Sequence, residues 1–225
     1  MNKSIRNHFL LLFLLSVLLA ACKPKAVDQT QERKYSLERV GPARVVQLYA
    51  DGFEQLPLQQ KIFSYYLYLA ALAGRDISID QHHRNALEVR DLFEAVITYP
   101  AGVDTTVLRK VTKYAKLFWI NNGFYDNITS QKFVPECTFE EFKLAAETAQ
   151  KNGADLGMRL GETLSGKLES LRKVVFDESY EPMMTDKTPG HDWVKESGVN
   201  FYSQGVTTKE VEALAKTGKE KNPLN

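Results

Sequence analysis

Apolar residues recur every three or four positions over long stretches of the chain, which predicts amphipathic helices. The clearest stripe belongs to a predicted helix from residue 107 onward and comprises Val107, Val111, Tyr114 and Phe118. This helix runs into a polar turn, Asn121-Asn122-Gly123, where glycine can take the positive φ that ends a helix. The same spacing predicts further helices near residues 58–73, 89–97, 142–149 and 160–175.

The predicted helix over residues 58–73 differs from the others because it is apolar on nearly all sides. It follows Pro57, which suits a first helical turn, and stops at Gly74. Its middle, residues 63–69, reads Phe-Ser-Tyr-Tyr-Leu-Tyr-Leu. A helix without a polar face is normally enclosed by protein, so we expect this one to be deeply packed.

Local signals complete the predicted secondary structure. Two capping boxes, each a threonine followed three residues later by a glutamate, begin helices: Thr138 with Glu141 and Thr207 with Glu210. Residues 43–49 contain a short β-prone run, which predicts a strand, and residues 199–202 suggest another short extended segment. We therefore predict a mainly α fold with a few short β-strands (α+β).

The first residues have the pattern of an export signal. Residues 1–21 combine a positive start with an apolar run of about 11 residues, too short to cross a bilayer. They end in Leu-Ala-Ala before Cys22, which resembles the cleavage box of bacterial lipoproteins; the alternative is an ordinary signal peptide with a chance cysteine. We expect residues 22–40 to be a flexible spacer after an acylated Cys22 and residues 41–225 to form the domain. The protein would be exported and lipid-anchored to a bacterial membrane, at its periplasmic face or on the cell surface.

The charge balance argues against nucleic acid as a partner. The chain has 29 Lys and Arg against 28 Asp and Glu, interspersed, whereas nucleic-acid binding favours a basic stripe. If Cys22 carries lipid, Cys137 is the remaining cysteine and an internal disulfide is impossible. With no histidine near it in sequence, Cys137 is interpreted as a buried, inert residue rather than a reactive thiol.

The sequence contains no complete metal-binding or nucleophile motif. A zinc site needs at least three ligands at workable spacing, and the histidines after residue 21 are His82, His83 and His191. His82 and His83 are adjacent, so on a helix they point about 100° apart and cannot chelate as an i, i+4 pair. His-Glu-x-x-His, Cys-x-x-Cys, Gly-x-Ser-x-Gly and a phosphate-binding glycine loop are all absent. We therefore expect this chain to bind no metal.

Two groups of polar residues are candidates for contact with a ligand. Asn121, Asn122 and Tyr125 could bind a peptide backbone, since amides and phenols supply neutral donors and acceptors. The alternative is that the two amides cap the free carbonyls at the helix end. Arg75 and Asp76, with Asp80, could face a substrate, or they could fix the turn between two helices through an ion pair.

Short segments in a fixed order carry a family resemblance: residues 58–67, 73–81, Trp119-Ile120-Asn121-Asn122-Gly123, Lys132-Phe133-Val134-Pro135, Val199-Asn200-Phe201-Tyr202 and residues 206–213. In this order and spacing they resemble the N-terminal part of dipeptidyl peptidase III, the zinc metallopeptidases of family M49, and specifically their bacterial lipoprotein branch. None of the segments is a catalytic motif.

The resemblance implies a two-lobed exopeptidase that releases dipeptides from the N-terminus of oligopeptides. In that family a helix bearing His-Glu-x-x-Gly-His and a further glutamate hold zinc in the other lobe, and the zinc activates the attacking water. The peptide lies extended between the lobes. By resemblance, the positions of this chain that would face the peptide are Asn121, Asn122, Gly123, Tyr125, Asn200 and Tyr202.

The chain departs from the family because it contains no His-Glu-x-x-Gly-His motif. We therefore expect residues 41–225 to be an incomplete N-terminal lobe, from a truncated record, an interrupted gene or a split protein. It would carry no catalytic residue, and its partners would be an oligopeptide and a zinc lobe outside this chain. The alternative is a non-catalytic helical lipoprotein that binds peptides or a protein partner.

Overall fold

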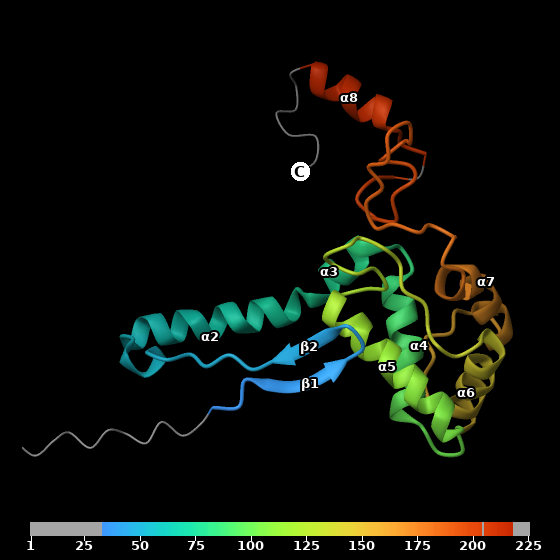
Figure 1. Cartoon of the computed structure of the whole chain (residues 1–225), viewed down its shortest axis with the longest axis horizontal. Helices are drawn as coiled ribbons and strands as arrows, with labels where there is room; N and C mark the ends of the chain where they lie inside the picture. The colour runs from blue at the N-terminus through green and yellow to red at the C-terminus, as the bar shows by residue number, and fades with distance from the viewer. Residues whose placement is uncertain (1–32, 204, 218–225) are drawn as a thin grey trace, which may run out of the picture. The chain divides into compact units, whose positions relative to one another are not determined.

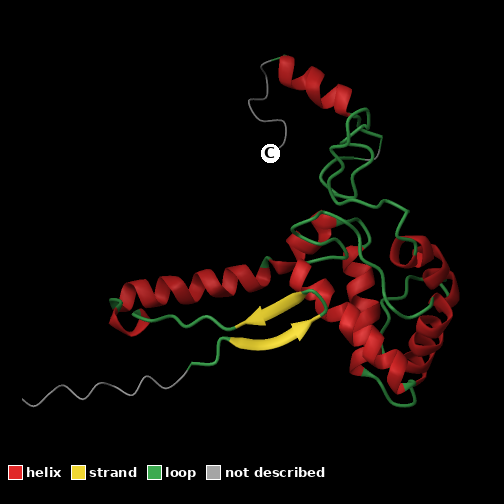
Figure 2. Ribbon diagram, in the orientation of Figure 1, coloured by secondary structure: helices red, strands yellow, loops and turns green. Residues whose placement is uncertain are grey.

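The computed structural model describes residues 33–203 and 205–217, and Figures 1 and 2 show the elements within them. These elements are the strands β1 (Ser36–Val40) and β2 (Ala43–Val46), the 3-10 helix η1 (Phe53–Gln55) and the α-helices α2 (Leu58–Ala73), α3 (Arg75–His82), α4 (Ala86–Thr98), α5 (Thr105–Asn121), α6 (Phe139–Lys151), α7 (Leu164–Phe176) and α8 (Thr208–Lys216). The prediction of a mainly α fold with a small β component is confirmed.

The chain separates into two compact units. The described part of the first comprises residues 33–37 and 46–48, where the Gln47 N–H donates to the Tyr35 carbonyl at 2.7 Å. The second comprises residues 38–45 and, from residue 49 onward, the rest of the described chain. All the helices named above belong to the second unit.

The core is built by α4, α5, α6 and α7. Helix α4 packs against α5 and α6, α5 also contacts α6, and α7 packs against α6 (Figure 1). Aromatic rings connect three of these helices: Phe93 of α4 stacks on Phe142 of α6 at a centroid distance of 4.2 Å and lies 4.5 Å from Tyr114 of α5. The predicted stripe of α5 is buried at each of its four positions, so the helical spacing identified the core-facing side correctly.

The helix boundaries largely follow the local signals in the sequence. Helix α2 ends before Gly74, and α6 and α8 both begin with complete capping boxes, so the threonine hydroxyl and the glutamate carboxylate satisfy the first backbone N–H groups. Helix α7 begins at Leu164, where the Thr163 hydroxyl accepts from the Gly166 N–H, and not at Leu160, which is fully exposed. The predicted stripe there began one turn too early.

Helix α2 forms where predicted but is not packed as predicted. None of its 16 residues is buried, and nine large apolar side chains are between 39% and 72% exposed: Leu58, Ile62, Phe63, Tyr65, Tyr66, Leu67, Tyr68, Leu69 and Leu72. The expectation of deep packing was wrong for the described chain, because an apolar pattern shows that a helix can be enclosed but not what encloses it. Nine half-exposed aromatic and aliphatic side chains together present roughly 900 Å² of apolar surface. A typical monomer exposes a largest apolar patch of about 300–600 Å².

Two extended segments also differ from expectation. Strand β2 was predicted, but its partner β1 lies within residues 22–40, which were expected to be a flexible spacer. The pairing with β2 through a turn at Gly41, whose φ is 54°, and the burial of Val40 give these residues an ordered structure. Residues 199–202 form no strand, although the Val199 and Asn200 N–H groups donate to the carbonyls of Met184 and Gln81. The predicted signal segment, residues 1–21, and Cys22 lie outside the described residues.

Candidate functional site

The predicted ligand-binding amides lie at the C-terminus of α5. Asn122 follows the helix in the left-handed conformation, with φ 54°, and the Gly123 N–H closes the end by donating to the Phe118 carbonyl at 3.0 Å. Asn121 is 7% exposed; its Nδ2 donates to the Leu117 carbonyl at 2.9 Å and its Oδ1 accepts from the Asn127 N–H at 3.0 Å. The Asn121 side chain therefore bonds within the last turns of α5 and to the following loop, and its amide is not presented to a ligand.

Tyr125 is also enclosed by the protein. It has no exposed surface, and its hydroxyl donates to the Glu181 carbonyl at 2.9 Å. Burial, followed by the charge of Glu181, raises the pKa of Tyr125 well above its usual value. Gly123 is buried beside His82: a Cβ atom added to Gly123 would lie 3.3 Å from the Cβ atom of His82. Of the residues predicted from this turn, Asn122 is the one whose side chain is partly exposed.

The predicted residues of the C-terminal segment lie apart from a built pocket. Asn200 is exposed, and its backbone N–H is bonded to α3 through Gln81. Tyr202 is half-buried and packs edge-on against Trp193 at a centroid distance of 6.4 Å. Trp193 is therefore a packing partner of Tyr202 in this loop.

A cluster of polar side chains, which we call the Glu181 cluster, connects the loop after α7 to the N-terminus of α4. The Glu181 carboxylate contacts His83 Nε2 at 2.8 Å and Arg84 Nη2 at 2.6 Å. His83 is completely buried, and its Nδ1 accepts from the Asn85 N–H at 3.1 Å. The neutral ring therefore carries its proton on Nε2 and donates it to Glu181.

The charges in this cluster follow from burial and hydrogen bonding. Burial alone would raise the pKa of Glu181, but the bonds from His83 and Arg84 outweigh it and hold the pKa at about 2. Burial lowers the pKa of His83, and Glu181 offsets only part of that effect. Glu181 also has a φ of 46°, which is unusual for a residue with a Cβ, so the cluster holds the backbone in a strained conformation.

Lys132 lies next to the Glu181 cluster and is 4% exposed. Its Nζ donates to the carbonyls of Tyr180 and Asp177, and it lies 5.7 Å from the centroid of the Phe124 ring. Burial lowers the pKa of Lys132 to about 8. This lysine and Glu181 were not identified from the sequence. Their donors and acceptors are occupied by the protein itself, so they hold the loop in place rather than face a substrate.

A pocket of about 280 Å³ lies where α3, α4 and the end of α5 meet. We call it the Trp119 pocket, and its lining combines charged, amide, aromatic and aliphatic side chains: Arg75, Ile79, Arg90, Glu94, Trp119 and Asn122. Arg90 reaches from α4 to Asp76 of α3 at 2.6 Å. Asp76 does take part in ion pairs, but its nearer partner is Arg90 of α4 rather than Arg75, so the closer pair joins α3 to α4 and does not fix the turn between α2 and α3.

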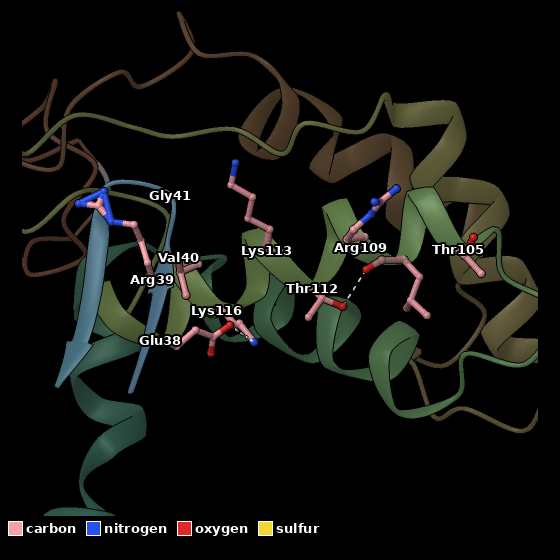
Figure 3. Close-up of a pocket in the computed structure, with 10 residues that line it drawn as sticks. Glu38, Arg39, Val40, Gly41, Thr105, Arg109, Thr112, Lys113 and Lys116 are labelled. Carbon is pink, nitrogen blue, oxygen red and sulfur yellow. Dashed lines mark hydrogen bonds and ion pairs between the residues drawn. The ribbon is translucent and has the colours of Figure 1, made fainter. Parts of the chain in front are cut away.

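A second hollow, of about 790 Å³, lies between β1 and the outer face of α5. Its lining is basic, with Arg39, Arg109, Lys113 and Lys116, and Figure 3 shows these side chains with Glu38. Lys116 is paired with Glu38 at 2.6 Å. Lys113 is paired with Glu136. Because these two lysines are neutralised by acidic neighbours, the groove presents less free charge than its composition suggests.

Three further groups have the chemistry of metal ligands: Asp186, His191 and Glu196, whose nearest ligand atoms lie within 4.8 Å of one another. His191 Nδ1 lies 2.8 Å from Asp186 and 3.3 Å from Glu196. The hydrogen bond to Asp186 raises the pKa of His191. These short contacts describe an ion cluster of one buried side chain, Asp186, and two exposed ones, His191 and Glu196.

Cys137 is buried, and burial raises the pKa of its thiol to about 11. The interpretation of Cys137 as an inert, buried residue agrees with this environment. Within residues 33–203 and 205–217, no helix is both long enough and apolar enough to cross a bilayer.

In comparisons with known proteins, neither a protein-family model nor a curated protein sequence matches the chain. The function is therefore inferred from the sequence segments and from the sites described above.

Proposed function

We propose that this chain is the N-terminal part of a zinc-dependent, dipeptidyl peptidase III-like exopeptidase that is exported and lipid-anchored through Cys22. The resemblance of the ordered segments between residues 58 and 213 supports the proposal. Zinc and the hydrolytic step would belong to a lobe outside this chain, because the chain has no His-Glu-x-x-Gly-His motif. This part would contribute peptide contacts and a surface against which the zinc lobe packs.

The exposure of α2 is the structural observation that carries the proposal. The helix presents roughly 900 Å² of apolar side chain, which is close to the ~800 Å² that each partner contributes to a stable protein interface. The exposed residues lie on all sides of the helix, so a single flat contact would leave part of them in water. A helix of this kind fits between other helices, as it would in a larger two-lobed enzyme.

A non-catalytic lipoprotein that binds peptides or a protein partner is the second candidate. The Trp119 pocket favours it, because this pocket is formed by the described chain without a further lobe. The two candidates differ in what α2 does in solution. A complete binding module would be monodisperse, whereas an incomplete lobe would bind apolar dyes and self-associate.

The test is to express this chain together with the nearest encoded segment that carries a His-Glu-x-x-Gly-His motif. We expect zinc-dependent release of dipeptides from an oligopeptide by the pair and none by either chain alone. A chelator should abolish the activity, and zinc should restore it. If no such segment is encoded nearby, or if the pair is as inactive as the separate chains, the exopeptidase proposal is wrong.

A further inference from the structure

The loop between α7 and α8 brings one imidazole and two carboxylates to a single point. His191 Nδ1 lies 2.8 Å from Asp186 Oδ2 and 3.3 Å from Glu196 Oε2, and the ligand atoms of the three residues all lie within 4.8 Å of one another. An imidazole nitrogen and carboxylate oxygens are ligands that Zn²⁺ takes in proteins. The three positions match none of the zinc motifs sought in the sequence, so the folding of the loop is what brings them together.

The distances between these atoms are close to those around a bound ion. In a tetrahedral zinc site with bonds of about 2.0–2.2 Å, neighbouring ligand atoms lie about 3.3–3.6 Å apart. The pair of His191 and Glu196 already has this separation. The atoms of His191 and Asp186, at 2.8 Å, would have to move apart by about 0.5 Å. The His191 and Glu196 side chains are 46% and 47% exposed, so they have room for this movement.

Hydrogen bonds from the backbone orient both carboxylates. Asp186 Oδ1 accepts from the Thr188 N–H at 2.9 Å, and the other oxygen of Asp186 faces His191. Glu196 Oε1 accepts from the Asp192 N–H at 3.1 Å, and its second oxygen likewise faces His191. Outer hydrogen bonds of this kind fix the ligands of metal sites. Each carboxylate is therefore arranged to give one oxygen to the same point.

The charge of the cluster is a separate observation that indicates a cation. Two carboxylates face a single imidazole, and among the described residues no Lys or Arg lies within ion-pair distance of Asp186 or Glu196. The Asp186 side chain is 9% exposed, so its charge is largely removed from water. Buried charges in proteins are normally paired or coordinate a metal. A divalent cation would supply the two positive charges that the two carboxylates require.

The ligand types indicate which class of cation fits. Ca²⁺ and Mg²⁺ take oxygen ligands, whereas imidazole suits Zn²⁺ and the other late first-row transition metals. Because His191 and Glu196 are about half exposed, the ion can enter from solvent, and water can fill the remaining coordination position.

We propose that Asp186, His191 and Glu196 form a binding site for a divalent transition-metal ion of the Zn²⁺ class. Nδ1 of the neutral His191 ring binds the ion, its proton is released to solvent, and the remaining ring proton lies on Nε2. Asp186 and Glu196 each give one oxygen, so the ion joins the two ends of residues 186–196. The inference does not rest on the proposed function, because all three ligands belong to this chain and the site needs no peptide.

The experiment is a calorimetric titration of the purified, metal-free chain with Zn²⁺ and, separately, with Mg²⁺. The deciding variant is His191→Lys, because a lysine keeps a positive charge between the carboxylates but has no lone pair to give to a metal. We expect saturable Zn²⁺ binding by the parent chain and at least about tenfold weaker binding by His191→Lys. Both proteins have the same other histidines and cysteines, so the difference between them reports this site. Equal Zn²⁺ affinities, no saturable Zn²⁺ binding, or Mg²⁺ binding as tight as that of Zn²⁺ would overturn the proposal.

The matched carboxylate variants are Glu196→Gln and Glu169→Gln. The Glu169 side chain is 49% exposed and also lies in an ion pair, with Arg172, but it has no histidine beside it. We expect Glu196→Gln to weaken Zn²⁺ binding at least about tenfold and Glu169→Gln to leave it unchanged. Equal effects of the two substitutions would contradict the assignment of Glu196. If a variant does not fold, the ring signals of His191 in the NMR spectrum of the parent chain decide: they should shift on addition of Zn²⁺, and unchanged signals would overturn the proposal.

The outcome is distinguishable from that of the exopeptidase test. Zn²⁺ binding by this chain that depends on His191, without activity in the paired chains, would retain the site and reject the enzyme. Zinc-dependent activity in the paired chains that is the same with His191→Lys, together with no Zn²⁺ binding by this chain alone, would do the reverse.

Discussion

The Glu181 cluster gives the most quantitative prediction, through the substitution Glu181→Gln. Glutamine has nearly the same shape, but it cannot accept hydrogen bonds from both His83 and Arg84, since one of its terminal atoms is a donor. A buried donor left without a partner costs about 1–3 kcal/mol. The pKa of Glu181 gives an upper value: a fall from 4.5 to about 2 corresponds to about 3–4 kcal/mol at 1.4 kcal/mol per unit. We expect the free energy of unfolding at pH 7 to fall by about 2–3 kcal/mol.

The same reasoning fixes the pH dependence. A carboxylate whose pKa is lowered by folding stabilises the protein fully above its unfolded pKa, and this contribution is lost as the pH falls through the folded pKa. The difference between the parent chain and Glu181→Gln should therefore persist down to about pH 5 and narrow from pH 4.5 towards pH 2. His83 has a lowered pKa in the folded chain, so both proteins should also lose stability as the pH falls below 6.5.

Urea unfolding followed by circular dichroism at a series of pH values measures both quantities. Glu178→Gln is the matched control, because Glu178 lies three residues away in the same loop, is exposed and should change stability by less than about 0.5 kcal/mol. A loss below about 1 kcal/mol for Glu181→Gln at pH 7, or a difference that stays constant from pH 7 to pH 3, would refute the reasoning.

Three other predictions test separate parts of the structure. A Cβ at Gly198 would lie 2.3 Å from the Tyr125 hydroxyl, so Gly198→Ala should destabilise the chain by roughly 1–3 kcal/mol in urea unfolding; a neutral result would mean that this close contact is absent. Phe63→Lys on α2 should reduce the binding of an apolar dye and change the unfolding free energy by less than about 0.5 kcal/mol, whereas a loss of several kcal/mol would show that α2 is buried. In a Cys22→Ser background, Cys137 should react with a disulfide reagent at pH 8 at least about a hundredfold more slowly in the folded chain than in urea, and rapid labelling of the folded chain would contradict its buried state.

The helices were the part of the structure that could best be predicted from the sequence, because their signals are local. Gly74, the capping box at Thr138 and the stripe along α5 each depend on neighbours within a few residues, and the structure has them as predicted. Strand β1 gave no such signal, since Ser36–Val40 is exposed at four of its five positions and owes its structure to pairing with β2.

The sites were harder to predict from the sequence because they depend on contacts between distant segments. His83 and Glu181 are 98 positions apart, and Glu181 lies in an irregular loop with no periodic pattern. Arg75 and Asn122 were both noted as candidates, but their place beside Glu94 in one pocket depends on how α3, α4 and α5 pack. The enclosure of Asn121 and Tyr125 likewise depends on the loops that cover them, and not on the turn in which they stand.

The state of α2 has a consequence for how any partner binds. Isolated helices shorter than about 12–15 residues are marginal in water even when they are rich in alanine. Helix α2, with 16 residues, is only slightly longer than this limit, and none of its residues is buried within the described chain. Its backbone amides should consequently exchange with solvent much faster than those of α5. A partner that encloses α2 would then also complete its folding, so association and ordering would be one coupled step and part of the binding energy would be spent on fixing the helix.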